Sequence, residues 1–120
     1  MPKINSVFWG KVKVDGQGYH QVLIVGNKVI ERDKSRLKTL FNTTHEIGDW
    51  EQKLLLTGEP EIILIASGFS GILKVKDSFK QKITGAGIEL KILLTPKAVD
   101  EYNRLVAAGS KVNALIHTTC

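Results

Sequence analysis

The feature that most constrains the fold is an apolar run that ends in a glycine-bounded turn. Five consecutive apolar residues, Ile62 to Ala66, lie between Pro60 and the turn Ser67 to Gly71. A run of this kind without polar alternation is typical of a strand buried on both faces. The two glycines, Gly68 and Gly71, let the backbone after the strand approach another group closely. We therefore expect a ligand or a partner to lie at this junction.

Length and composition indicate one domain that spans residues 1–120. The chain has 120 residues, 42% of them hydrophobic and 24% charged, which is ordinary for a globular protein. A chain of this size buries roughly two thirds of the surface that its unfolded form exposes. No apolar run approaches the roughly 20 residues of a membrane-spanning helix, and residues 1–6 lack a signal-peptide core. We expect a cytoplasmic protein with no membrane contact.

Cysteine and histidine are too sparse for a cofactor or metal site to be predicted. Cys120 is the sole cysteine, so it forms no internal disulfide, and a reducing compartment suits it. The three histidines, His20, His45 and His117, lie far apart in the sequence and do not form the closely spaced set of a structural zinc site. We therefore expect no metal and no cofactor.

The net charge of +5 is concentrated in two basic patches. Such patches suit phosphate groups or acidic partners, but lysines of this kind more often lie solvated at the surface and keep a protein soluble. We therefore expect no nucleic-acid binding, although it stays open as a third alternative. The patches are Lys28, Arg32, Lys34, Arg36 and Lys38 in one, and Lys74, Lys76, Lys80 and Lys82 in the other.

The first third of the chain predicts antiparallel strands. Val12 and Val14 alternate with lysines, a turn follows at residues 15–18, and a second apolar run covers Tyr19 to Val25. Gly26 and Asn27 tolerate the positive φ of a tight hairpin turn before a strand from Val29 to Arg32. This pattern indicates a β-meander. Residues 33–46 show no periodicity and are predicted to form a long irregular connection.

The remainder predicts alternating helices and strands, and therefore a layered α/β domain with a mixed sheet. A short helix is expected after Gly48, with Trp50, Leu54 and Leu55 on its apolar side, and ends at Gly58. Asp77 is expected to cap a second helix that buries Phe79 and Ile83 and ends near Gly85. A strand from Ile88 to Leu94 precedes a helix that Thr95 caps and Pro96 starts, with Val99, Tyr102 and Val106 as its apolar stripe and Gly109 at its end, and a last strand covers Val112 to Ile116.

The glycine turn is the first candidate site. Its residues Ser67, Gly68, Phe69, Ser70 and Gly71 can present backbone N–H groups to an anion, as phosphate-binding loops do. A dinucleotide fingerprint would need glycine at position 66, and a nucleophile elbow would need glycine at position 72, where the chain has alanine and isoleucine. A ligand or partner site and simple chain geometry are both consistent with this turn.

Two further sets are candidates. His117 and Cys120 are a potential base and nucleophile, but a histidine hydrogen-bonded at a strand end and a small buried thiol are the favoured interpretation. Arg32 can clamp a carboxylate or a phosphate, and His45 can titrate near neutral pH. We favour a structural role here too, in which His45 and Glu46 cap the following helix. Trp9 and Trp50 are expected to be core or lid aromatic residues rather than stacking platforms.

Several motifs together resemble a small α/β family of uncharacterised proteins. This family is typed by a methanogen protein and also includes the adipogenesis-associated protein and a mitochondrial complex I assembly factor. The resemblance implies a three-layer single domain around a central mixed sheet, no established enzymatic activity for most members, and assembly or adaptor roles in the eukaryotic members. The chain departs from many relatives at Ala66, where they carry glycine, and it lacks a tryptophan near residues 31–34. The motifs are Phe8-Trp9-Gly10-Lys11, Val14-Asp15-Gly16, the connection from Arg32 to His45, the turn at 67–71 with Leu73-Lys74-Val75, the segment 98–103 and the segment 114–120.

The sequence favours a non-catalytic binding or assembly-factor-like module. Its predicted cleft lies between the glycine turn, the loop from Arg32 to His45 and the C-terminal tail, and receives a small anionic ligand or a segment of a protein partner. The alternative is a small enzyme for an anionic substrate, with His45 or His117 as the base, Cys120 or Ser70 as the nucleophile, and the turn as an oxyanion site. A homodimer paired through an edge strand of the meander also stays open.

Overall fold

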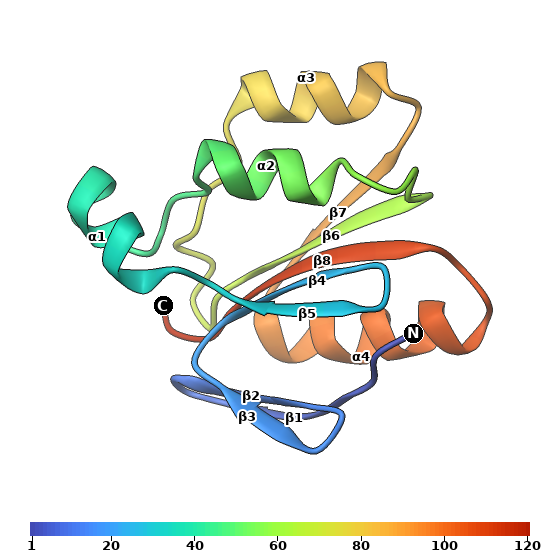
Figure 1. Ribbon diagram of the computed structural model, residues 1–120, viewed down its shortest axis with the longest axis horizontal. Coiled ribbons are helices and arrows are strands. Elements are labelled where there is room, and N and C mark those ends of the chain that lie inside the picture. The colour runs from blue at the N-terminus through green and yellow to red at the C-terminus, as the bar shows by residue number, and fades with distance from the viewer.

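Two β-sheets form the framework of the computed structural model, which describes residues 1–120 (Figure 1). The smaller sheet is an antiparallel meander of three strands, and the larger sheet has five strands in the order β5-β4-β8-β6-β7. The meander consists of β1 (Ile4–Phe8), β2 (Lys11–Val14) and β3 (Gln17–Tyr19). The larger sheet consists of β4 (Val22–Val25), β5 (Lys28–Glu31), β6 (Ile62–Ser67), β7 (Glu89–Leu93) and β8 (Val112–His117).

The larger sheet is mixed, as the sequence predicted. β4 runs antiparallel to β5 and β8, whereas β6 runs parallel to β7 and β8. All six residues of β6 are buried, which confirms a strand covered on both faces. The register of β6 and β8 pairs Ser67 with His117. The glycine turn after β6 and the tail after β8 therefore leave the sheet side by side.

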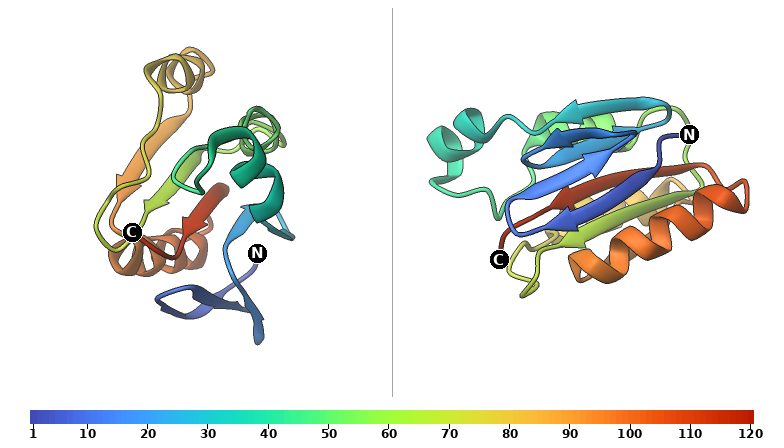
Figure 2. Two further views of the ribbon diagram at one scale, coloured as in Figure 1. Left: turned by 90° about the vertical axis from the view of Figure 1, so that its left-hand side faces the viewer. Right: turned by 90° about the horizontal axis from the view of Figure 1, so that it is seen from below.

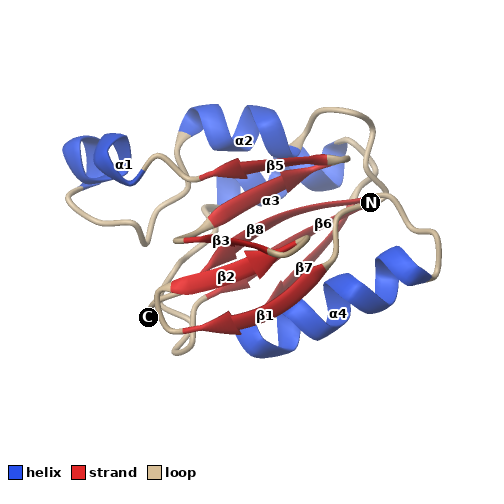
Figure 3. Cartoon of the chain, turned by 60° about the horizontal axis from the view of Figure 1, so that its bottom comes forward, coloured by secondary structure: helices blue, strands red, loops and turns tan.

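Four helices complete a three-layer arrangement. They are α1 (Lys34–Phe41), α2 (Asp49–Leu55), α3 (Asp77–Gly85) and α4 (Thr95–Ala107). Figure 2 shows α2 and α3 on one face of the larger sheet, and α4 together with the meander on the other. Figure 3 shows the meander lying across that second face beside α4. None of these helices has the length and apolarity that crossing a membrane requires.

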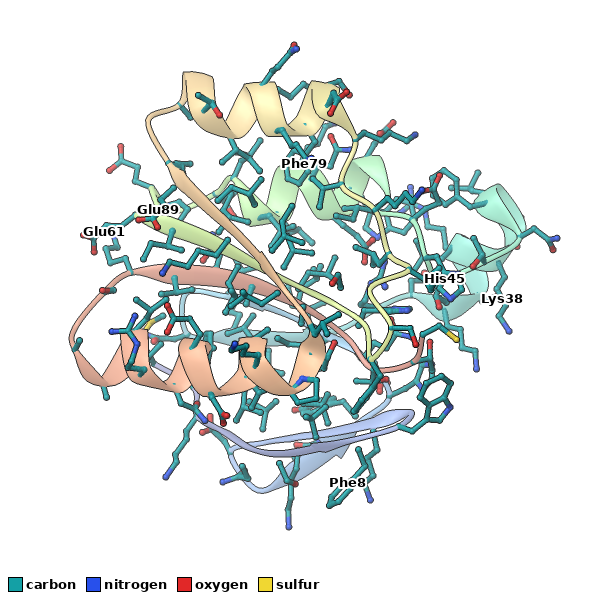
Figure 4. The ribbon with its side chains drawn as sticks, turned by 180° about the vertical axis from the view of Figure 1, so that it is seen from behind. Phe8, Lys38, His45, Glu61, Phe79 and Glu89 are labelled. Carbon is teal, nitrogen blue, oxygen red and sulfur yellow. The ribbon has the colours of Figure 1, made fainter.

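Each face of the larger sheet has its own hydrophobic core. Leu64 and Ala66 of β6 face a cluster with Tyr102 of α4 and the buried valines of β2. Ile63 and Ile65 face the opposite way, into a cluster with Phe79 and Ile83 of α3 and Leu55 of α2. Figure 4 shows the Phe79 ring pointing from α3 toward the sheet. The alternation along β6 explains why every position in the run is apolar.

The structure corrects several predicted elements. Residues 33–46 were expected to be irregular, yet they contain α1, because the Asp33 carboxylate accepts a hydrogen bond from the Arg36 N–H at 2.9 Å and caps the helix. The run from Tyr19 to Val25 is not one strand: it divides between β3 and β4, which belong to different sheets. α3 begins at Asp77 itself, with Lys76 as its N-cap residue.

Candidate functional site

The glycine turn holds the last residues of the same chain. The N–H of Phe69 donates to the Thr119 carbonyl at 2.8 Å, and the N–H groups of Ser70 and Ile72 donate to the Cys120 oxygen at 3.0 and 3.1 Å. These are the donors that the sequence suggested for an anion. In the structure they are used within the protein, so the turn acts as a clamp on residues 119 and 120.

Gly68 is required at the tightest point of this clamp. Its φ is +105°, and a Cβ built on it would lie 2.3 Å from the carbonyl carbon and oxygen of Cys120. The same Cβ would lie 2.9 Å from Cδ2 of His117. The predicted close approach of the backbone to another group is therefore present, and that group is the chain itself.

Thr95 joins three segments at the base of the turn. Its hydroxyl accepts a hydrogen bond from the Gly68 N–H at 2.9 Å and donates to the His117 carbonyl at 2.5 Å. Its own N–H donates to the Gly68 carbonyl at 3.0 Å. The prediction that Thr95 caps α4 is therefore wrong: Thr95 is the first residue of the helix, Leu94 is the N-cap residue, and the hydroxyl serves the turn instead.

Arg32 has no donor left for a ligand. Nε and Nη2 donate to the two carboxylate oxygens of Glu51 at 2.7 and 2.8 Å, and Nη2 also donates to the Glu46 carbonyl at 2.7 Å. Nη1 donates to Gln21 Oε1 at 2.7 Å and to the Thr44 carbonyl at 3.0 Å. A guanidinium has five N–H donors, and these bonds use all five. The predicted carboxylate clamp exists, but its carboxylate is the buried Glu51 of α2.

His117 is buried and neutral. Gln21 Oε1 is fixed as a carbonyl because Arg32 donates to it, so His117 Nδ1 donates its proton to that oxygen at 2.9 Å. His117 Nε2 is then the acceptor for the Thr119 hydroxyl at 3.2 Å. Burial, and to a smaller extent the positive charge of Arg32, lowers the pKa of His117 to about 3. The favoured interpretation of a hydrogen-bonded histidine at a strand end fits this geometry.

His45 lies against this network but does not cap a helix. Its ring meets the His117 ring edge-on, with centroids 5.2 Å apart and an interplanar angle of 85°. Its carbonyl accepts a weak hydrogen bond from the Lys74 N–H at 3.4 Å. The predicted capping role is wrong, because Gly48 is the N-cap residue of α2 and its N–H donates to Glu51 Oε1. Figure 4 shows His45 on the loop that follows α1.

The turn, the loop and the tail therefore converge, but no nucleophile is paired with a base. The hydrogen-bond partners of His117 are Gln21 and Thr119, and neither Ser70 nor Cys120 donates to an imidazole. Cys120 is half-buried rather than buried, and Ser70 is exposed. Ser67 is buried and its hydroxyl donates to the Leu93 carbonyl at 3.1 Å. These groups position one another and do not form a catalytic arrangement.

The structure also differs from the predicted cleft. Residues 119 and 120 occupy the space in front of the turn, and none of the five surface cavities is lined by residues 67–71. No group of three or more His, Cys, Asp or Glu side chains is placed to share a metal ion. Every buried side-chain nitrogen and oxygen has a hydrogen-bond partner. No unsatisfied polar group at this site points to a missing ligand.

Sequence reasoning missed an apolar surface around the clamp. Seven large apolar side chains are exposed, and three of them lie here: Trp9 at 60%, Leu94 at 50% and Ile72 at 46%. The half-buried Phe69 joins them, with its ring centroid 5.8 Å from that of Trp9. We call these four residues the apolar rim. Trp9 was expected in the core or under a lid, and its exposure is the main correction among the aromatic residues.

A family model described as a protein of unknown function (DUF498/DUF598) matches residues 4–117. The chain belongs to this family. It is similar to the solved structure of a conserved hypothetical protein, PH1505 of Pyrococcus horikoshii, with 25% identity and a TM-score of 0.84, over 98% of this chain and 99% of that one.

Two further structures support the same DUF498/DUF598 fold. The protein MT938 has 27% identity and a TM-score of 0.76, and the match covers both chains completely. XCC1710 of Xanthomonas campestris has 16% identity and a TM-score of 0.71, over 98% of this chain and 85% of that one, and it supports the fold alone. The predicted resemblance to a small uncharacterised family is therefore confirmed at the level of the family.

In this DUF498/DUF598 member, the two predicted basic patches differ in how far they are exposed. Arg32 is buried, and the Arg36 guanidinium stacks on the Trp50 ring at 3.9 Å, so the first patch is not a continuous basic surface. The four lysines of the second patch are all exposed: Lys74, Lys76, Lys80 and Lys82.

Proposed function

We propose that this chain is a non-catalytic binding module that holds a segment of a protein partner on its apolar rim, in the manner of an assembly factor. The observation that carries the proposal is the rim itself. Large contiguous apolar patches are rare on monomeric proteins and mark interaction surfaces. Trp9 carries no backbone constraint of the clamp, so its exposure is not explained by the turn alone.

A rigid support favours binding on this surface. Phe69 and Ile72 are fixed by N–H bonds to residues 119 and 120, and Leu94 precedes the anchored Thr95. Ordering a flexible loop on association costs free energy, which a preformed surface avoids. In this proposal Phe69 and Ser70 touch the partner. The other predicted site residues hold the surface in place: Ser67, Gly68, Gly71, Arg32, His45, His117 and Cys120.

The same geometry argues against the enzyme alternative. An acyl-transfer or hydrolytic site needs a nucleophile within hydrogen-bond reach of its base and free donors for the oxyanion. Here the turn donors serve the tail and both candidate nucleophiles lack an imidazole partner. The proposal includes a cytoplasmic location, because one unpaired thiol suits a reducing compartment.

The test compares proteins that co-purify with matched variants from the native cell. Trp9→Ser removes the exposed aromatic side chain of the rim, and Leu40→Ser removes an equally exposed side chain of α1 outside it, 59% exposed against 60% for Trp9. We expect a stoichiometric partner with the wild type and with Leu40→Ser, and its loss with Trp9→Ser. Recovery of the same partner at the same ratio with Trp9→Ser contradicts the proposal. Absence of any partner from all three also contradicts it.

A further inference from the structure

We infer that the segment bound by the apolar rim is an acidic peptide with large apolar anchor residues. This inference rests on the proposed function and adds the chemistry of the partner. Two observations support it: the rim spans four connected segments of the chain, and those same segments carry a net positive charge.

Hydrogen bonds join the segments that carry the rim. The Gly10 N–H donates to the Thr118 carbonyl at 2.8 Å, which joins the β1–β2 turn to the tail. The tail is joined to the glycine turn through Phe69, and the glycine turn to the start of α4 through Gly68 and Thr95. A Cβ on Gly71 would lie 3.2 Å from Leu94 Cδ2, so Leu94 lies directly beside the turn.

The segments that build this surface carry only positive charge. Residues 8–11, 68–76, 94–97 and 118–120 contain four lysines and no Asp or Glu. All four lysines are exposed: Lys11, Lys74, Lys76 and Lys97. Complementary charge steers association and selects partners of the opposite sign.

The carboxylates nearest to these segments cancel only part of this charge. Asp77 directly follows Lys76, and Asp100 and Glu101 share a surface hollow with Lys97. Glu101 already pairs with Lys91 at 2.7 Å and with Arg104 at 2.6 Å. Counting Asp77 and Asp100 against the four lysines leaves a net charge of +2. Glu31 shares another hollow with Lys11, where Glu31 Oε2 accepts the His20 N–H at 2.9 Å. An acidic partner segment that crosses the rim therefore meets segments of net positive charge.

The side-chain types favour a peptide over nucleic acid or a lipid surface. Single-stranded nucleic acid is held by aromatic faces on which successive bases stack. Here the Trp9 and Phe69 rings lie at 40° to each other, and two of the four rim residues are aliphatic: Ile72 and Leu94. Electrostatic lipid binding is typical of clusters of roughly four to eight basic residues, and four is the lower end of that range. Aromatic and aliphatic contacts with a charged border are usual for protein interfaces.

The test selects peptides from a displayed library of random 12-residue sequences. The baits are the full-length wild type, Trp9→Ser, and a rim charge-reversal variant in which Lys11, Lys74, Lys76 and Lys97 become Glu. A matched variant reverses four exposed lysines outside the rim segments and has the same net charge. Those control positions are Lys28, Lys53, Lys80 and Lys111. Urea unfolding of every bait shows that each is folded.

We expect the wild type and the control variant to enrich peptides with Asp or Glu around aromatic or aliphatic residues. The rim charge-reversal variant should enrich basic peptides instead. For the strongest peptide, synthesised and measured by fluorescence anisotropy, Trp9→Ser should weaken binding by about 30-fold, as expected for an aromatic anchor.

Failure of the inference is distinguishable from failure of the proposed function. Peptides that depend on Trp9 but are neutral or basic overturn the acidic chemistry and leave the binding module intact. Absence of any Trp9-dependent peptide overturns both. Trp9-dependent binding to phosphatidylserine vesicles or to an oligonucleotide, without peptide enrichment, overturns the inference in favour of a lipid or nucleic acid. A dimer in sedimentation that Trp9→Ser dissociates overturns it in favour of a second copy.

Discussion

Replacing Gly68 with alanine should remove a large part of the stability of the protein. The backbone at Gly68 has a φ of +105°, in a region that residues with a side chain rarely adopt. Strain of this kind costs about 1–3 kcal/mol. This first contribution depends only on the local backbone and would be present at any glycine with a similar φ.

The second contribution comes from the tail. The new methyl group would lie 2.3 Å from backbone atoms of Cys120, which are not the movable end of a flexible side chain. If the backbone shifts without loss of bonds, the overpacking costs about 1–3 kcal/mol. If the tail leaves instead, three hydrogen bonds are lost at about 0.5–1.5 kcal/mol each. Together with the strain, we expect a loss of about 2–6 kcal/mol in the first case and about 2.5–7.5 kcal/mol in the second.

Urea unfolding followed by circular dichroism measures this loss. Gly109→Ala is the matched control, because Gly109 has a φ of +88° and no atom within 4 Å of its built Cβ. The control should show only the strain, about 1–3 kcal/mol. Equal losses in the two variants would refute the reasoning, because the clamp on residues 119 and 120 would then contribute nothing to stability.

Three other variants test the surroundings of the clamp. Arg32→Met should cost about 3–5 kcal/mol of unfolding free energy because it leaves the buried Glu51 carboxylate unpaired. The double variant with Glu51→Leu should cost less than the sum of the two single changes. Additive losses in urea unfolding would contradict a coupled pair. The folded protein holds the pKa of His117 at about 3, below its ordinary 6.5, so stability should be full above pH 6.5 and fall as the pH drops below it, by up to about 1.4 kcal/mol per pH unit. Denaturant titrations at several pH values from 7 to 5 should show that the unfolding free energy of His117→Gln falls less steeply with decreasing pH than that of the wild type. An equally steep fall would show that His117 is not the source of the pH dependence. Trp9→Ser should change the unfolding free energy by less than about 0.5 kcal/mol, and a loss above 2 kcal/mol would mean that the side chain is structural.

Local patterns in the sequence were enough to predict the central strand, the glycine turn and the larger helices. β6 is an apolar run with no polar interruption, and its burial on both faces follows from that pattern alone. α1 was missed because only one of its eight residues, Leu37, is buried, so the helix has almost no apolar periodicity to detect. Its capping by Asp33 was the available signal.

The site depended on contacts between segments that no local pattern reveals. Arg32 and Glu51 are 19 residues apart, and His117 and Gln21 are 96 apart. The turn was correctly predicted to present N–H groups to an acceptor, but its acceptors are carbonyls about 50 residues later in the chain. The exposure of Trp9 was equally hidden, because a tryptophan at a strand end packs inward or outward according to the tertiary fold.

Backbone amide exchange at the turn tests the central claim most directly. In ¹⁵N-resolved NMR spectra, the amides of Phe69, Ser70 and Ile72 should exchange slowly although they lie outside regular secondary structure. Addition of millimolar inorganic phosphate should leave their shifts and exchange rates unchanged, because residues 119 and 120 already accept their hydrogen bonds. Rapid exchange that phosphate slows, together with shifts confined to these amides, would contradict the account and identify the turn as an anion site.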